Sequence, residues 1–189
     1  IGCGPVGLAL TAALYRQGKC PIIATGFSER RRAAAEDLGC DIVLDPGQES
    51  PFERWDDLGF TTSPASPLLE RSFRGLPPGA NIFDCVGKPG LIDSIIKSAP
   101  RHSHLIIVGV CAHEGKLSPR EAIVNELTVD FSFAYRPQEF AEALSCISDD
   151  PDRAHAFITS TLPLGETPPA FQRLARRPDE IKVLINPRL

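Results

Sequence analysis

A glycine-rich turn at the start of the chain constrains its fold more than any other feature. Gly2, Gly4 and Gly7 follow the spacing Gly-x-Gly-x-x-Gly, and the run after them has apolar residues at helical spacing. Gly2 permits a tight turn out of a strand, Gly4 lets the backbone approach a pyrophosphate, and Gly7 lets the helix pack closely on a sheet. The first helical amides can then bind phosphate oxygens. The motif therefore predicts a dinucleotide site, with Pro5 and Val6 in the first helical turn.

Strand-like and helix-like segments alternate after this turn. Short, continuous apolar runs are typical of parallel strands that are buried on both faces. We expect strands at Ile1 and at residues 21–25, 41–44, 81–86, 105–110 and 128–134. We expect helices at residues 5–17, 28–38, 52–58, 91–98, 119–126 and 137–148, and mostly loop at 59–79. Ser28 is expected to be the N-cap of the second helix. The alternation predicts an α/β fold with a doubly wound parallel sheet, the Rossmann type.

The rhythm changes after an acidic, proline-containing stretch at residues 149–152. A strand at 157–162, a helix at 167–175 and a strand at 181–185 are expected beyond it. We therefore predict two parts, a dinucleotide-binding domain at residues 1–150 and a C-terminal segment at residues 151–189.

The end of the second strand bears on the choice of cofactor. A carboxylate there would bind the ribose hydroxyls of NAD, but this chain has Gly26 followed by Phe27. Gly26 leaves room, and the arginines at 30–32, Arg31 among them, supply the positive charge that a 2′-phosphate requires. These features favour NADP over NAD. Two points weigh against NADP: Glu29 would repel a phosphate, and the arginines also suit the solvated face of a helix.

The carboxyl ends of two later strands are candidates for the nicotinamide end of the site. In a doubly wound sheet the ring lies beyond these ends, near the point where the strand order reverses. Val86 and the run Val108, Gly109 and Val110 occupy them, and small or apolar residues there leave backbone groups free to contact the ring.

Composition excludes several classes of function. The net charge is −4 and the isoelectric point is about 5.6, so the basic surplus of a nucleic-acid binder is absent. No apolar run approaches the roughly 18 residues that span a bilayer. The six cysteines form no Cys-x-x-Cys pair and several lie in apolar runs, which predicts free thiols in a reducing, cytoplasmic protein.

Several motifs together resemble the cofactor domain of the medium-chain dehydrogenases, the zinc-containing alcohol dehydrogenase family. They are residues 1–7, 35–43, 83–87 and 107–110, with the tail positions Ala170, Phe171, Leu174 and 182–185. The resemblance implies hydride transfer between a small alcohol or carbonyl substrate and NADP or NAD. It also implies that the tail belongs to a GroES-like catalytic domain. The segment 127–132 is similar to a strand that often joins two subunits in this family, so a homo-oligomer is expected.

The family's zinc ligands precede the glycine-rich turn, where this sequence has nothing. The chain begins with Ile1 and contains no Met, so we expect a piece cut within the first strand, with zinc only in the missing domain. The pairs at 102–104 and 111–113 lack the three or four convergent ligands of a zinc site. No catalytic residue and no metal ligand is therefore assigned.

Three alternatives stay open at this point. The full protein could be a zinc-independent relative of the quinone reductases, since the discriminating ligands are missing. A non-catalytic nucleotide-binding module and an S-adenosylmethionine-dependent methyltransferase also use this fold, although Gly26 lacks the acidic side chain that a methyltransferase needs. If the fragment interpretation holds, the tail strands should pack poorly on the main sheet.

Overall fold

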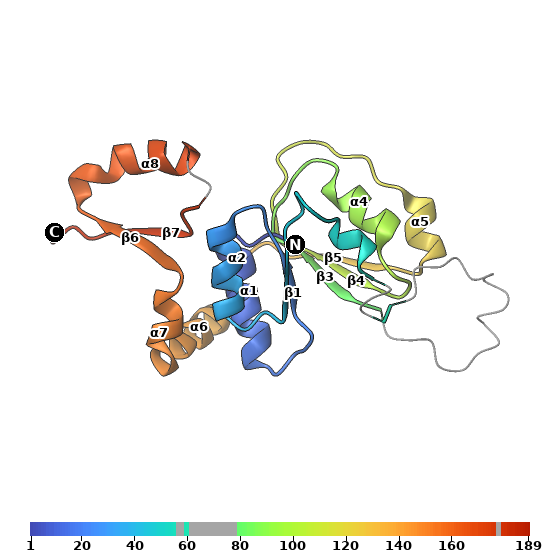
Figure 1. The fold of residues 1–189 in the computed structure, drawn as a ribbon, viewed down its shortest axis with the longest axis horizontal. Coiled ribbons are helices and arrows are strands. Elements are labelled where there is room, and N and C mark those ends of the chain that lie inside the picture. Colours follow the sequence, from blue (N-terminus) through green and yellow to red (C-terminus); the bar gives the residue numbers. More distant parts are fainter. Residues whose placement is uncertain (56–58, 61–78, 177–178) are drawn as a thin grey trace. The chain divides into compact units, whose positions relative to one another are not determined.

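The computed structural model describes residues 1–55, 59–60, 79–176 and 179–189 (Figure 1). These residues fall into two compact units: Ile1 with 49–133, and 2–48 with 134–189. The predicted division after residue 150 stays a prediction. The loop predicted at 59–79 lies mostly outside the described residues, as does the end of the predicted helix 52–58. Within the described ranges, no helix is both long and apolar enough to cross a membrane.

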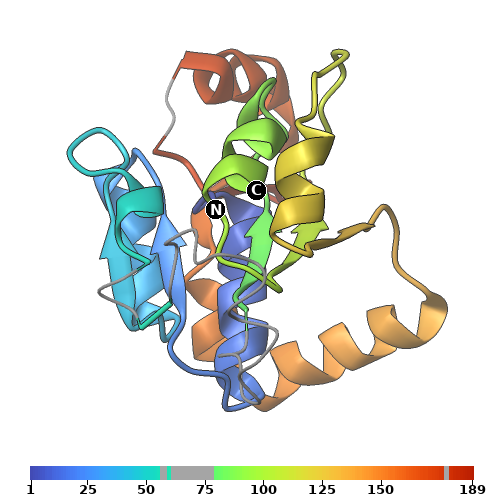
Figure 2. The same cartoon turned by 90° about the vertical axis from the view of Figure 1, so that its right-hand side faces the viewer.

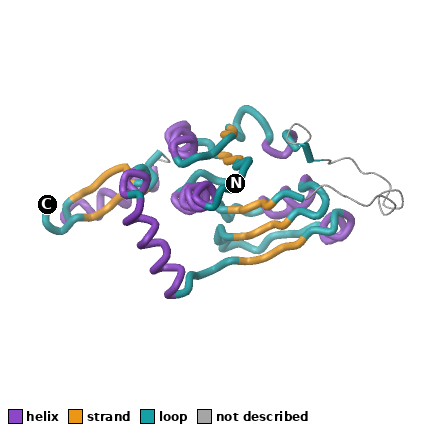
Figure 3. Tube along the Cα trace, turned by 90° about the horizontal axis from the view of Figure 1, so that it is seen from below, coloured by secondary structure: helices purple, strands orange, loops and turns teal. Residues whose placement is uncertain are grey.

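The first unit is built on a three-stranded parallel sheet in the order β3, β4, β5. Figure 3 shows the three strands side by side. The bounds are β3 (Asn81–Asp84), β4 (His104–Ile107), β5 (Thr128–Phe131), α4 (Leu91–Ser98), α5 (Pro119–Val124) and the 3-10 turn η1 (Pro51–Glu53). Helix α4 repeats its apolar residues at helical spacing, and its Ile95 is buried with Ile82 and Leu105 of the sheet. This packing forms the core of the unit.

Ile1 is joined to this sheet without forming a strand of its own. Its amino group donates to the Phe83 carbonyl at 2.6 Å, and its carbonyl accepts from the Cys85 amide at 2.9 Å. The strand predicted at Ile1 is therefore represented by one residue that pairs with β3.

The second unit begins with a parallel pair of strands, β1 (Ile23–Thr25) and β2 (Ile42–Leu44). Helices α1 (Pro5–Arg16) and α2 (Glu29–Asp37) alternate with them, and Figure 2 shows the two strands running together. Leu8, Ala35 and Leu38 are fully buried and form the core of this unit. Ser28 caps α2, because its Oγ accepts from the Arg31 amide, as the sequence predicts.

Residues 134–189 belong to the same unit. They form α6 (Pro137–Asp149), α7 (Pro151–His155), β6 (Ile158–Leu162), η2 (Leu164–Glu166), α8 (Thr167–Arg176) and β7 (Lys182–Ile185). Strands β6 and β7 pair with each other in a parallel two-stranded sheet. Ile181, just before β7, is buried in the cluster that contains Leu8, with Phe157 packed against it. Within the described residues the tail strands pair only with each other, and the tail residue buried in this cluster, Ile181, precedes β7. The expected poor packing of the tail strands on the main sheet therefore stays a prediction.

The predicted parallel α/β arrangement is confirmed, with differences at the strand ends. The predicted strands 81–86 and 105–110 end earlier, at Asp84 and Ile107. The reason is Asp84: its side chain accepts from the amides of Val86 and Gly87, and its carbonyl accepts from the amides that follow β4. These bonds replace the ladder pairing of a continuing strand, so the chain turns away. The expected single sheet is divided: β1 pairs with β2 in one sheet, and β3, β4 and β5 pair in that order in another.

Candidate nucleotide-binding site

The glycine-rich turn leads into α1 in the geometry that its sequence predicts. Gly2 has a φ of +99°, which favours glycine, and its amide donates to the Thr25 carbonyl at 2.9 Å. Gly4 is the N-cap of α1, and Pro5 opens the helix. A Cβ added to Gly4 would meet no atom within 4 Å, so this glycine faces open space.

The amino end of α1 has the properties of a phosphate site. The amides of Val6 and Gly7 lie in the first turn, where an α-helix supplies no acceptor. In the described part of the chain no side chain caps this end, and the first turn contains no acidic residue. The helix dipole adds partial positive charge at the same place. The turn therefore fits the pyrophosphate of a dinucleotide, with Gly4 giving the close approach.

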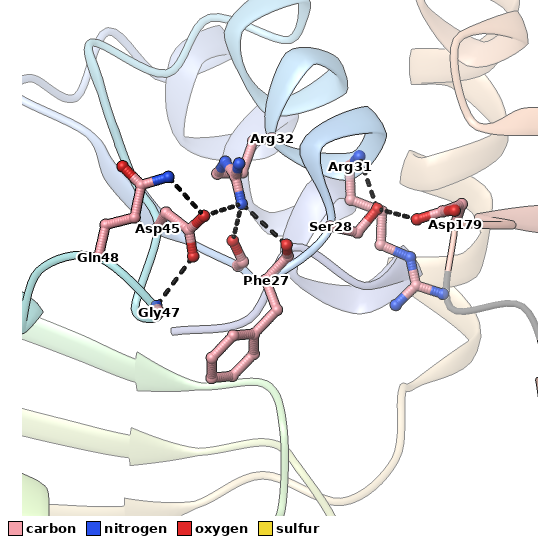
Figure 4. A network of polar contacts seen from close by, with 9 residues as sticks. Phe27, Ser28, Arg31, Arg32, Asp45, Gly47, Gln48 and Asp179 are labelled. Carbon is pink, nitrogen blue, oxygen red and sulfur yellow. Dashed lines mark hydrogen bonds and ion pairs between the residues drawn. The ribbon is translucent and has the colours of Figure 1, made fainter.

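The segment after β1 holds the second group of predicted residues, shown in Figure 4. Gly26 directly follows the strand, and its amide donates to the Leu44 carbonyl of β2 at 3.1 Å. The side chain of Phe27 is exposed. Arg31 is not free for a ligand in this structure, because its guanidinium donates to the carbonyl of Glu180.

The structure assigns a different role to Gly26 from the one that its sequence suggests. A Cβ at Gly26 would lie 2.9 Å from Cβ and 3.0 Å from Sγ of Cys3. The position that a Cβ of residue 26 would take is thus occupied by the Cys3 side chain, so packing against Cys3 requires a glycine here. Burial raises the pKa of the Cys3 thiol to about 11, so the thiol packs as a neutral, apolar group.

Two carboxylates near this segment, Asp45 and Asp179, were missed by the sequence analysis, and Arg32 was counted there only as one of three positive charges. Arg32 donates to the carbonyls of Gly26 and Phe27 at 2.8 and 2.9 Å and forms a 3.1 Å ion pair with Asp45. Asp179 accepts from Ser28 Oγ at 2.8 Å. Asp45 was predictable in principle, because it directly follows β2 and parallel neighbours end at the same edge. Asp179 was not, since it lies 151 positions from Ser28.

The residues predicted for the nicotinamide lie in the other unit, just beyond strand ends. The amides of Val108 and Gly109 both donate to the carbonyl of Asp84, at 2.9 and 2.7 Å. The carboxylate of Asp84 accepts from the amides of Val86 and Gly87 at 2.8 and 3.2 Å. Asp84 is completely buried, and it ties both predicted segments to the end of β3.

A cavity of about 380 Å³ opens at the carboxyl ends of β4 and β5. Predicted residues Val108, Gly109 and Val110 line it. Its other walls come from the segment after β3, from the loop after β4 and from the end of β5. These walls were not predicted, and they are formed by residues 88–90, 92–93, 107, 111, 113, 115–117 and 131–133. The cavity places apolar and small side chains beside the predicted nicotinamide contacts.

Metal ligands do not gather within the described residues, where no group of three His, Cys, Asp or Glu side chains could hold an ion. His104 Nε2 lies 2.8 Å from Asp130, and His102 Nδ1 lies 3.4 Å from Glu126. The Cys111 thiol contacts the carbonyl of His113. The described residues therefore do not fit a zinc ion, and no chemical step is assigned to zinc here.

Comparison with known protein families identifies relatives of this chain. Residues 5–149 match the family model described as zinc-binding dehydrogenase, which is most of the chain. The chain belongs to the zinc-binding dehydrogenase family. Among curated relatives, it is 26% identical over 187 residues to (R,R)-butanediol dehydrogenase of Bacillus subtilis, a match covering 98% of this chain and 49% of that protein. It is 25% identical over 184 residues to sorbitol dehydrogenase of Mus musculus, covering 97% and 47%.

Solved structures of several dehydrogenases share the fold. The crystal structure of 2R,3R-butanediol dehydrogenase from Bacillus subtilis superposes with a TM-score of 0.73 at 26% identity, covering 98% of this chain and 49% of that one. An alcohol dehydrogenase from E. coli in complex with NADH gives 0.77 at 16% identity, covering 98% and 50%. A zinc-binding dehydrogenase from Sinorhizobium meliloti bound to NADP gives 0.74 at 23%, covering 98% and 51%. The chain spans about half the length of the curated relatives it matches.

Proposed function

We propose that this chain is the nicotinamide-cofactor part of a dehydrogenase that interconverts a small alcohol and its carbonyl compound. The observation that carries the proposal is the amino end of α1: Gly2 at positive φ, open space at Gly4 and a first turn without a side-chain cap. Membership of the zinc-binding dehydrogenase family supports the reaction class. The nicotinamide supplies the chemistry when bound, by accepting or giving a hydride.

The residues of this chain bind and orient the cofactor in the proposed reaction. The amides of Val6 and Gly7 hold the pyrophosphate, and the segment 26–31 faces the adenosine ribose. Val86 and the run 108–110 contact the nicotinamide, and residues 108–110 also line the cavity at the ends of β4 and β5. The zinc and the substrate contacts belong to residues outside those described.

The names of the curated relatives support a narrower substrate class. They include dehydrogenases named for butanediol, sorbitol, arabinitol and altritol, all compounds with several hydroxyl groups. We therefore extend the proposal to a small diol or polyol as the alcohol.

Self-association completes the proposal. Strand β5 pairs with β4 on one side and lies at the edge of the described sheet. Phe131 and Phe133 at its end expose 74% and 93% of their surfaces. Unpaired edge amides and exposed aromatic rings suit pairing with a second copy, so we propose a homo-oligomer joined through β5.

Cofactor binding tests the proposed function directly. The full chain is titrated with NADH and with NADPH while nicotinamide fluorescence is followed, and at least one of them should bind. Gly4→Ala should weaken binding about tenfold or more, because the added methyl group enters the space of the pyrophosphate.

Gly165→Ala is the matched control for this test. Gly165 also faces open space, but it lies in η2, so its substitution should leave binding unchanged. A folded chain that ignores both cofactors would refute the proposed function. Equal binding by Gly4→Ala and the wild type would refute the role of the turn.

A further inference from the structure

The ribose end of the proposed site contains an ion pair that its sequence does not reveal. Arg32 and Asp45 lie 3.1 Å apart, with only 18% and 20% of their side chains exposed. The same Nη1 atom of Arg32 donates to the carbonyls of Gly26 and Phe27. Arg32, one of the three arginines that suggest a 2′-phosphate, is thus already bound to acceptors of this chain (Figure 4).

Asp45 is held in a defined orientation by the turn that follows β2. Its Oδ1 accepts from the Gly47 amide at 2.9 Å, and its Oδ2 accepts from Gln48 at 3.4 Å and from Arg32. The register pairs Thr25 with Leu44, so Asp45 follows β2 at the level where Gly26 follows β1. A carboxylate therefore lies beside the end of β1, although β1 itself carries none.

Cys3 explains why the carboxylate does not come from β1. Any side chain at Gly26 would approach Cys3 Cβ to 2.9 Å, which is closer than carbon atoms pack. With a buried cysteine at this place in the glycine-rich turn, an aspartate at position 26 would have to displace it. Position 45, on the neighbouring strand, has no such conflict, because its side chain already reaches the segment after β1 through Arg32.

A second carboxylate contacts the segment after β1, because Asp179 accepts from Ser28 Oγ. The backbone carbonyl of Glu180 accepts from the Arg31 guanidinium. A dianionic phosphate entering here would meet Asp45 and Asp179 and would have to compete with Asp45 for Arg32. Ribose hydroxyls meet the same carboxylates as hydrogen-bond acceptors.

We propose that Asp45, by neutralising Arg32 and presenting a carboxylate beside Gly26, makes this chain select NAD(H) over NADP(H). The proposal rests on the proposed function, since it concerns the ribose end of the same cofactor site. It reverses the preference that Gly26 and the arginines suggest when they are considered alone.

Asp45→Asn tests the selectivity. The amide oxygen can still accept from the Gly47 amide, whereas the negative charge that neutralises Arg32 is removed. Arg32 keeps its bonds to the carbonyls of Gly26 and Phe27 and stays at the same place as an uncompensated cation. The readout is the ratio of the dissociation constants of NADPH and NADH, measured by fluorescence titration of the full chain. The wild type should favour NADH, and Asp45→Asn should shift the ratio toward NADPH by about tenfold.

Two further variants identify the cause of such a shift. Adding Arg32→Gln to Asp45→Asn should remove the gain in NADPH affinity, because the uncompensated cation is gone. Asp149→Asn is the same substitution at a more exposed ion pair, the 2.6 Å contact with Arg16, and should leave the ratio unchanged. A folding defect would weaken both cofactors together, so a gain for NADPH reports selectivity.

The outcomes separate this inference from the proposed function. If the folded wild type binds neither cofactor, the proposed function fails and the inference fails with it. If both bind but the wild type favours NADPH, or Asp45→Asn leaves the ratio unchanged, the inference alone is overturned.

Discussion

The contact between Gly26 and Cys3 makes a quantitative prediction about stability. The Cβ of Gly26→Ala would lie 2.9 Å from Cys3 Cβ and 3.0 Å from Cys3 Sγ. Carbon atoms pack at about 3.5–4.0 Å, so each pair overlaps by roughly 0.5 Å or more. Overpacking of this kind costs about 1–3 kcal/mol. The alanine recovers about 0.4–1 kcal/mol by restricting the unfolded chain, and a net loss of about 1–2 kcal/mol follows.

The choice of partner substitution isolates the cause. Cys3→Gly removes both clashing atoms and leaves the Cys3 amide nitrogen, at 3.4 Å, as the nearest neighbour. Cys3→Ala removes Sγ only and leaves the 2.9 Å contact. Gly26→Ala should therefore be slightly stabilising, by about 0.4–1 kcal/mol, in the Cys3→Gly background and still destabilising in the Cys3→Ala background.

Guanidinium unfolding of the single and double variants measures these differences. The double-mutant cycle removes the cost of losing the Cys3 side chain itself, which occurs in both arms. A coupling free energy of about 1–3 kcal/mol, the overpacking cost alone, is expected with Cys3→Gly, and less with Cys3→Ala. If the two couplings are equal, or both are zero, packing against Cys3 is not the reason for the glycine.

Three other predictions concern separate parts of the chain. Asp84→Ala should lower the free energy of unfolding by about 3 kcal/mol, because two amide bonds to a buried carboxylate are lost, and urea denaturation checks this. Since burial raises the pKa of Cys3 from 9.0 to about 11, the native thiol keeps its proton where the unfolded one loses it. Wild-type stability relative to Cys3→Ala should then be constant below about pH 9 and fall as the pH rises toward 11. Phe133→Lys should weaken self-association through β5, as measured by sedimentation.

Each of these has an outcome that contradicts it. Asp84→Ala with wild-type stability would mean that the bonds to Val86 and Gly87 contribute nothing net. A difference between wild type and Cys3→Ala that does not change with pH would mean that the Cys3 thiol is not desolvated. A wild-type chain that stays monomeric at high concentration would contradict self-association through β5.

The elements that local patterns determine were predictable. Helix α4 has the bounds that its apolar spacing predicts, and the N-cap of α2 is the predicted Ser28. The turn from Gly2 into α1 follows from a motif in which each glycine has a separate steric reason. All of these depend on residues close together in the chain, so a single sequence contains the necessary information.

The ends of β3 and β4 were not predictable in the same way. Apolar residues continue past both ends, so the periodicity alone extends the strands to Val86 and Val110. The Asp84 carboxylate stops β3 through local bonds from the amides of Val86 and Gly87. The Asp84 carbonyl stops β4 through bonds from the amides that follow it, more than 20 residues away in the chain. Only this second pair of bonds requires the strands to lie side by side, so the sequence alone does not reveal it.

The ribose end of the site shows the same limit with a functional consequence. Gly26, taken as one position in a motif, indicates room for a phosphate, and the arginines after it indicate positive charge. In the structure the Cβ position of residue 26 is occupied by Cys3, which lies 23 positions before Gly26 in the chain. The charge of Arg32 is neutralised by Asp45, which lies 13 positions after Arg32. Selectivity depends on the local balance of charge and space, which several segments determine together. Substituting position 26 alone therefore cannot reveal the preference of this chain, whereas changing Asp45 alters the charge balance while the packing around Cys3 stays intact.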